Sequence, residues 1–125
     1  MFSDAIFART GEGKYAVEAT AVFAGNDISI CVVGGTLPHI GAVSLAVYEA
    51  SRDSATVSTV CVHTHRDDAV AAYFAKSVSR EIKCTVTVSA GLHVDDATDT
   101  DIRLLWDNAC VCCSHLIKAL KTGEE

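Results

Sequence analysis

The first half of the chain shows the two-residue alternation of apolar and polar side chains that is typical of β-strands. From residue 15 to residue 23, apolar residues occupy every second position, and Glu18 and Thr20 lie between them. A nearly continuous apolar run follows and predicts a central strand. Two further runs, joined by a polar turn at residues 51–54, predict a hairpin. The predicted strands are residues 15–23, 28–33, 42–48 and 55–62.

The hydrophobic period changes to about four residues in the second half of the chain. Residues 67–82 have an apolar side chain at every fourth position and predict an amphipathic helix. Residues 84–88 predict a fifth strand. A longer helix is expected to start at Thr98 or Asp99 and to stop near Gly123, because lysines suit its negative end and glycine suits its termination.

This order of elements, ββββαβα, predicts a single-domain α/β sandwich with a mixed sheet. Two strands joined by a helix are normally parallel with a right-handed crossover, so the carboxyl ends of the fourth and fifth predicted strands should meet at one end of the sheet. Both helices should begin at that end. The loop after the second predicted strand reaches it only if that strand runs parallel to the other two.

Three short polar loops follow apolar runs, and together they hold four of the five histidines. The first loop is residues 34–41, the second is residues 63–68 and the third is residues 91–96. Their convergence would build one binding site at the strand ends. The predicted site residues are Gly34, Gly35, Thr36, Pro38, His39, Ile40, Gly41, His63, His65, Arg66, Asp68, Gly91, His93 and Asp95.

The first two loops have residue types that suit an anion. Gly34 and Gly35 allow backbone N–H groups to approach a ligand closely, and Thr36 adds a hydroxyl donor. His65 and Arg66 can bind a phosphate or a carboxylate, the arginine in a bidentate manner. The first loop can equally be a plain glycine turn, and the second a solvated helix start.

The third loop places an imidazole and a carboxylate two residues apart. His93 and Asp95 suit general-base chemistry, a metal site or a hydrogen-bonded pair. For any single histidine a structural hydrogen bond is the commoner role, and it is the joint pattern of three loops that points to a site. A divalent metal has four weak candidate ligands, which are His65, Asp68, His93 and Asp95.

Composition narrows the function classes. A chain of 125 residues makes one domain that can bury a core unaided. The net charge of −6 and the lack of any Lys/Arg cluster argue against nucleic acid as a partner. The first residues lack a basic region followed by an apolar run, and no apolar stretch reaches the length of a membrane span, so we expect a cytoplasmic location without membrane contact.

The six cysteines are interpreted as free thiols of a reducing compartment. Three of them, Cys31, Cys61 and Cys84, fall in strand-like runs and are expected to pack in the core. Two lie near the apolar stripe of the last helix, which the sequence predicts to include Ile102, whereas Cys110 faces away from it. These two are Cys112 and Cys113.

Three motifs together resemble the LpdD-like family. They are Gly-Gly-Thr-x-Pro-His-Ile-Gly at residues 34–41, His-Arg-Asp-Asp at residues 65–68 and Gly-Leu-His-Val-Asp-Asp-Ala-Thr at residues 91–98. The resemblance runs from Tyr15 into the last helix and implies one LpdD-like domain with a core at about residues 14–121. The first dozen residues and the cysteine-rich stretch lie outside it.

The resemblance implies a cofactor-handling role. The family includes a small accessory protein of gallate decarboxylase that acts as a prenylated-flavin chaperone, and its fold is similar to proteasome-assembly-chaperone domains. It implies binding of prenylated FMN, or FMN, for a UbiD-like decarboxylase, with a flavin prenyltransferase as a further partner. The phosphate would then lie near Thr36, His65 and Arg66, and the ring edge near His39, His63, His93 and Asp95.

Two other function classes stay open at this point. The His/Asp loops can belong to a small metal-dependent or acid/base enzyme, or the chain can be an assembly factor that binds only a partner protein through a strand edge. A homodimer is also expected, since a first strand at a sheet edge can pair with its copy and dimers are the commonest closed assembly.

Overall fold

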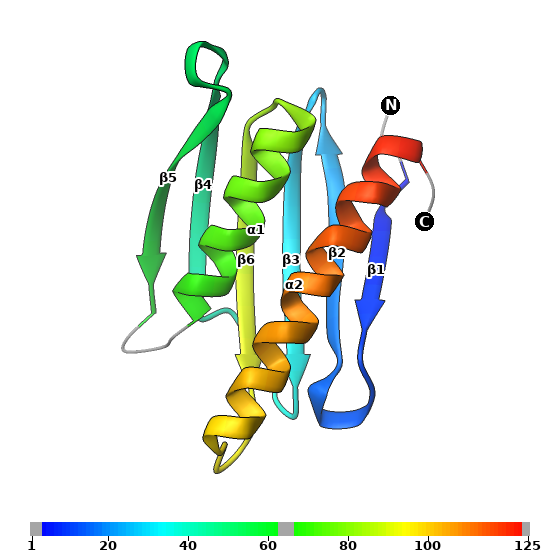
Figure 1. Ribbon diagram of the computed structural model, residues 1–125, viewed down its shortest axis with the longest axis vertical. Coiled ribbons are helices and arrows are strands. Elements are labelled where there is room, and N and C mark those ends of the chain that lie inside the picture. Colours follow the sequence, from blue (N-terminus) through cyan, green and yellow to red (C-terminus); the bar gives the residue numbers. More distant parts are fainter. Residues whose placement is uncertain (1–3, 63–66, 124–125) are drawn as a thin grey trace.

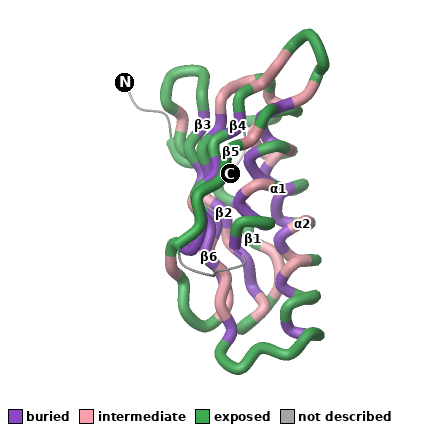
Figure 2. Tube along the Cα trace, turned by 90° about the vertical axis from the view of Figure 1, so that its left-hand side faces the viewer, coloured by how far each residue is buried: buried purple, intermediate pink, exposed green. Residues whose placement is uncertain are grey.

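The computed structural model describes residues 4–62 and 67–123 as one six-stranded sheet with two helices on one face. Figure 1 shows α1 and α2 side by side in front of the strands, and Figure 2 shows the same two layers edge-on. The elements are β1 (Ile6–Thr10), η1 (Gly13–Tyr15), β2 (Val17–Ala24), β3 (Asp27–Gly35), β4 (Ala42–Glu49), η2 (Ala50–Arg52), β5 (Ser54–Cys61), α1 (Asp67–Ile82), β6 (Val86–His93) and α2 (Asp99–Thr122).

The strand order is β1-β2-β3-β6-β4-β5, and only the β3–β6 pair is parallel. Because β4 is antiparallel to both β5 and β6, those two strands run in the same direction, as the helix between them predicts. The parallel pairing also brings the end of β3 next to the end of β6, where Gly35 lies opposite His93. We call this end of the sheet the loop end, and the expected convergence of the first and third loops is confirmed there.

The core lies between the sheet and the two helices. α1 packs against β4, β5 and β6, and α2 packs against β1 and β2. Alternation along each strand decides which side chains reach the core, so β2 and β3 bury every second residue. Many inward positions are alanine or valine, which allows the helices to lie close to the strands. The largest side chain that is fully buried is Phe74 of α1.

The structure extends the predicted order by one strand at the start of the chain. β1 pairs with β2 and buries Ile6 and Ala8 in the core. Five residues with a single apolar–polar alternation are too short to stand out in the sequence. Tyr15, which the sequence places in the first strand, belongs instead to η1, and its hydroxyl donates to Asp101.

Three predicted core positions are wrong. Cys31 and Cys61 are exposed, whereas Cys84 is partly buried and packs against the core. Cys31 faces the side of the sheet without helices, and Cys61 lies at the end of the edge strand β5, so neither meets a second layer. Ile102 is exposed because it lies in the first turn of α2, beyond the end of the sheet layer.

The cysteines of α2 behave as predicted. Cys112 and Cys113 are buried in the core, while Cys110 is only partly buried. Burial raises the pKa of Cys112 to about 11 and that of Cys113 to about 12. Thiols with such pKa values stay neutral at physiological pH and behave as small apolar groups. Separately, none of the helices in the described part of the chain is long and apolar enough to cross a membrane.

Candidate functional site

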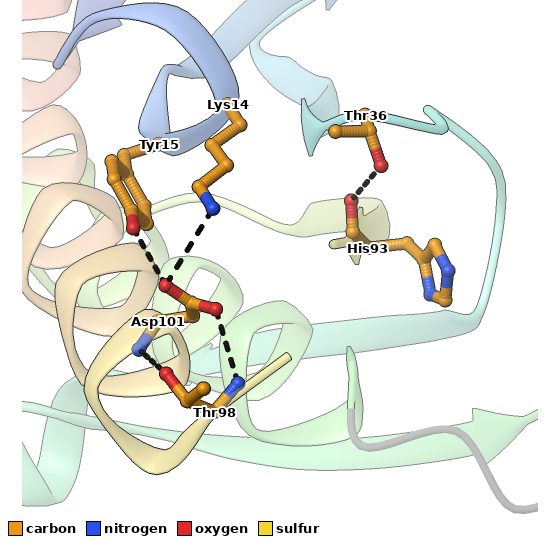
Figure 3. A network of polar contacts seen from close by, with 6 residues as sticks. All are labelled: Lys14, Tyr15, Thr36, His93, Thr98 and Asp101. Carbon is orange, nitrogen blue, oxygen red and sulfur yellow. Dashed lines mark hydrogen bonds and ion pairs between the residues drawn. The ribbon is translucent and has the colours of Figure 1, made fainter. Parts of the chain in front are cut away.

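The first and third loops are held together by backbone contacts at the loop end. The N–H of Thr36 donates to the carbonyl of His93 at 2.7 Å, and its hydroxyl reaches the same oxygen at 3.4 Å (Figure 3). The N–H of Gly41 donates to Ala90 at 2.8 Å, so both ends of the first loop are tied to β6. The loop therefore arches over the end of β6, with His39 at its middle.

Asp67 joins the second loop to the other two. Its side chain is 6% exposed, its Oδ1 accepts the N–H of Leu92 at 2.8 Å, and its Oδ2 lies 3.1 Å from Nε2 of His39. One oxygen thus meets the end of β6 and the other meets the first loop. A buried carboxylate needs such partners to offset the loss of water. Asp67 is therefore the group that holds the first loop, α1 and the third loop in one arrangement.

Two glycines make this close packing possible. A Cβ at Gly41 would lie 1.9 Å from Oδ2 of Asp67, and a Cβ at Gly91 would lie 1.8 Å from the carbonyl oxygen of His39. Neither position has room for a side chain of any size. The glycines of the motifs thus serve the contact between protein segments, and they place His39 against the end of β6.

His39 has an oxygen near each of its ring nitrogens. Nδ1 lies 3.0 Å from the carbonyl oxygen of Leu37, and Nε2 faces Asp67. Both ring nitrogens of His39 therefore face oxygen atoms of the protein, which fixes the orientation of the ring within the first loop.

A second histidine faces the first across the loops. The rings of His39 and His93 meet edge-to-face, with centroids 6.2 Å apart and an interplanar angle of 85°. Nε2 of His93 lies 2.8 Å from Oδ1 of Asp95, so the expected His/Asp pair is formed. His93 is half-exposed, and its ring points towards the loop after β3 in Figure 3. The two imidazoles therefore present polar edges at a surface that a ligand can reach.

Exposed apolar side chains lie on the first loop and at the end of β5. Leu37 is 59% exposed and Ile40 56% exposed on the first loop, and Val62 is 41% exposed where β5 ends. The N–H of Val62 donates to the carbonyl of Gly41 at 2.8 Å, which joins this residue to the first loop. A surface with both imidazoles and exposed aliphatic groups suits a flat, largely apolar ring system that carries polar atoms at its edge.

The backbone of the first loop does not form the anion cradle that the glycines suggested. The N–H of Gly35 donates to Ala16, and that of Thr36 donates to His93. Both donors are used inside the protein because the loop lies directly on β2 and β6. Gly35, with φ +81°, allows the chain to turn at this point.

The start of α2 is also occupied by the protein's own groups. Thr98 accepts the N–H of Asp101 and Asp101 accepts the N–H of Thr98, which forms a capping box (Figure 3). The Tyr15 hydroxyl donates to Asp101 at 2.6 Å, and Lys14 lies 4.0 Å away. The Tyr15 hydrogen bond first, and the Thr98 N–H second, hold the pKa of Asp101 below its usual value. Two N–H groups at this helix start therefore serve internal hydrogen bonds, and the carboxylates of Asp99 and Asp101 oppose an anionic ligand there.

Some of the other predicted site residues lie at the loop end, and three lie outside the described residues. Gly34, Pro38, Asp68 and Asp95 lie at the loop end with the others, Asp68 and Asp95 on its exposed rim. Within residues 4–62 and 67–123, no group of three or more His, Cys, Asp or Glu side chains could hold a metal ion. The predicted ligands that lie outside the described residues are His63, His65 and Arg66.

The sequence does not single out three residues that matter for this site. It indicates Asp67 only as a favourable charge in the first turn of α1, because the contacts of Asp67 with His39 and Leu92 cross between loops. Leu37 and Val62 look like ordinary loop and strand residues. The only sequence signal for this aliphatic pair is an apolar residue inside a short polar loop, which is a weak indication by itself.

Three comparisons place the chain among known proteins. The profile of the prenylated flavin chaperone LpdD-like domain matches residues 11–121. Protein LpdD of Lactiplantibacillus plantarum is 29% identical over 93 residues, which cover 74% of this chain and 68% of that protein. A chain from the crystal structure of a chaperone complex for yeast 20S proteasome assembly matches with a TM-score of 0.57 and 18% identity, covering 94% of this chain and 96% of that one. At that identity the likeness shows the fold alone, which is the fold the sequence predicted.

Proposed function

The chain belongs to the prenylated flavin chaperone LpdD-like family, and from this premise we propose that it binds prenylated FMN and delivers or matures it for a UbiD-like decarboxylase. Its role as a chaperone follows from the family, and a chaperone acts on a partner protein. The nature of the cofactor and of the partner enzyme is the part that we propose.

The observation that carries the proposal is the surface at the loop end. Exposed Leu37 and Ile40 lie on the same loop as His39, and His93 faces that loop from β6. A prenylated isoalloxazine is a broad apolar ring with carbonyl and N–H groups along one edge. The aliphatic groups would contact its face and the imidazoles its polar edge.

The structure favours the ring over the phosphate as the recognised part of the cofactor. The amides of Gly35 and Thr36 and the capped start of α2 are already used. We therefore expect the prenylated ring to contribute most of the binding energy and the phosphate less.

Binding is tested by anaerobic native mass spectrometry, with FMN and prenylated FMN offered in turn. We expect a stoichiometric adduct with prenylated FMN and a weaker one with FMN. His93→Ala and Ile40→Ser should each weaken the prenylated adduct about tenfold or more, on the order of one lost hydrogen bond or one lost apolar contact. His115→Ala is the matched control, since His115 is an exposed histidine of α2 away from the loops.

The same measurement distinguishes the other function classes. A folded protein that binds neither flavin but activates the decarboxylase would be a protein-only assembly factor. A protein that binds neither flavin but takes up a divalent metal would support the enzyme hypothesis. Either result would overturn the flavin proposal.

A further inference from the structure

The side of the sheet opposite the helices is open and partly apolar. We call it the open face. In its middle row Phe7, Cys31, Val43 and Val60 lie on β1, β3, β4 and β5, in line with Thr20 and Ser89. Large apolar side chains are exposed on four of its six strands, β1, β2, β4 and β5. They are Phe7, Val22, Val43, Leu45, Val47 and Val60.

The centre of the open face carries no charge. The outward side chains within β3, β6, β4 and β5 are serine, threonine, cysteine, valine and leucine, apart from Asp27, Glu49 and His93 at the strand ends. The charged pair on this face, Arg9 and Glu18, lies towards the β1–β2 side and is self-neutralising at 3.1 Å. In a chain with a net charge of −6, this is a surface through which two copies can approach without like-charge repulsion.

The size of the open face matches what a stable dimer needs. Six strands at a spacing of about 4.8 Å and a length of about eight residues give a face of roughly 750 Å². A stable interface buries about 800 Å² on each partner. Antiparallel sheets with one apolar face commonly pack on a second sheet at about 10 Å. A second copy of the same sheet supplies a surface of the required size and polarity.

We propose that the open face is a self-association surface through which two copies of this chain stack sheet against sheet. The helices then lie on the outside of the dimer. The loop end lies at one end of the open face, with His93 at an outward position of β6, so the stacked sheets must leave that end of the strands uncovered. This arrangement goes beyond the flavin proposal and does not depend on it.

The alternative of edge pairing uses less of the molecule. β1 is an edge strand of only five residues, and pairing through it would leave Leu45 and Val47 in water. The sheet-on-sheet arrangement covers these residues. The two arrangements differ in which substitutions they tolerate, so they can be separated by experiment.

The test is the oligomeric state of the full chain, measured by size-exclusion chromatography with light scattering from about 1 to about 100 µM. We expect a wild-type dimer and at least a roughly 100-fold weaker dimer for Leu45→Lys, because a buried unpaired charge opposes association. The control is Ile102→Lys: Ile102 is 49% exposed on α2, compared with 42% for Leu45, but lies away from the open face. It should remain dimeric.

A second substitution protects the test against misfolding. Val60→Lys changes the most exposed apolar side chain of the face, 72% exposed on the edge strand, where a fold effect is small. Circular dichroism should match wild type for each variant used. A monomeric wild type at the highest concentration, or folded Lys variants that remain dimeric, would overturn the proposal. If the wild type is monomeric and the Lys variants fail to activate the decarboxylase, the open face is a surface that binds the partner enzyme instead.

Cys31 provides an independent test. It lies in the middle row on a central strand and is exposed. Stacked sheets lie about 10 Å apart, and a two-fold axis through the middle of the open face would place the two copies of Cys31 at about that distance. A bismaleimide of that span should crosslink wild type into a dimer on a gel and leave Cys31→Ser monomeric. Equal crosslinking of Cys31→Ser would contradict this arrangement.

Discussion

Two buried aspartates at the loop end, Asp67 and Asp101, both lie near the start of a helix but have different roles. Each lies in the first turn of a helix, and each is less than a tenth exposed. Asp101 completes the capping box of its own helix and accepts the Tyr15 hydroxyl. Asp67 turns away from its helix and binds the backbone of β6 and the ring of His39.

The two aspartates therefore differ in role: Asp101 stabilises the fold, and Asp67 assembles the candidate site. The partners of Asp101 fix where α2 starts and attach η1 to it, and the candidate site contacts none of them. The partners of Asp67 are the two loops that carry the imidazoles. An aspartate in the first turn of a helix therefore supports the fold in one case and the geometry of the binding surface in the other.

The largest expected effect comes from Asp67→Ala. It leaves the Leu92 N–H buried without an acceptor and releases His39, which should cost about 3 kcal/mol in the free energy of unfolding. Urea denaturation at neutral pH measures this. Flavin binding should be lost in the same protein while it is still folded.

The variant Asp67→Asn separates the two roles of Asp67. Its amide oxygen can still accept from Leu92, but its NH₂ group can take the place of the acceptor that faces His39. We expect most of the stability to return while flavin binding stays weak. A variant that regains both would show that the His39 contact has no part in binding.

A smaller effect is expected from Thr98→Ala, which removes the capping partner of Asp101 at the start of α2. Loss of the capping hydroxyl should cost about 1 kcal/mol in the free energy of unfolding. Flavin affinity should not change, because Thr98 touches neither histidine. Thr98→Ser, which keeps the hydroxyl, is the control. A tenfold loss of affinity in Thr98→Ala would break the distinction between the two aspartates.

The smallest expected effect is a change in how far the stability of the fold decreases as the pH is lowered. The folded pKa of Asp101 is lowered, chiefly by the Tyr15 hydrogen bond, so its contribution to stability is present above the unfolded pKa of about 4 and is lost as pH falls through the lower folded value. Tyr15→Phe removes the main cause of that shift. Urea midpoints between about pH 6 and about pH 2.5 should therefore fall less steeply with acid than in wild type. Parallel curves would mean that this hydrogen bond does not lower the pKa of Asp101.

Much of the fold is predictable from local pattern. The helix at Asp67–Ile82 agrees with its prediction at both ends, and the capped start of α2 lies where Thr98 and Asp99 indicated. Helical period, caps and turn residues act within a few positions of the chain, so they are visible in sequence. β1 escapes prediction because a strand of five residues owes its place to pairing with β2.

The site is only partly predictable for the same reason. The sequence by itself determined the loops, their histidines and the strand ends on which they sit. Tertiary structure alone decided that β3 runs parallel to β6, that Asp67 reaches Leu92 and His39, and that Gly41 and Gly91 lie where a Cβ would collide. It also decided that Cys31 faces outward. Hydrophobic alternation states that one side of a strand is buried, but which segments meet there depends on contacts between residues far apart in the chain.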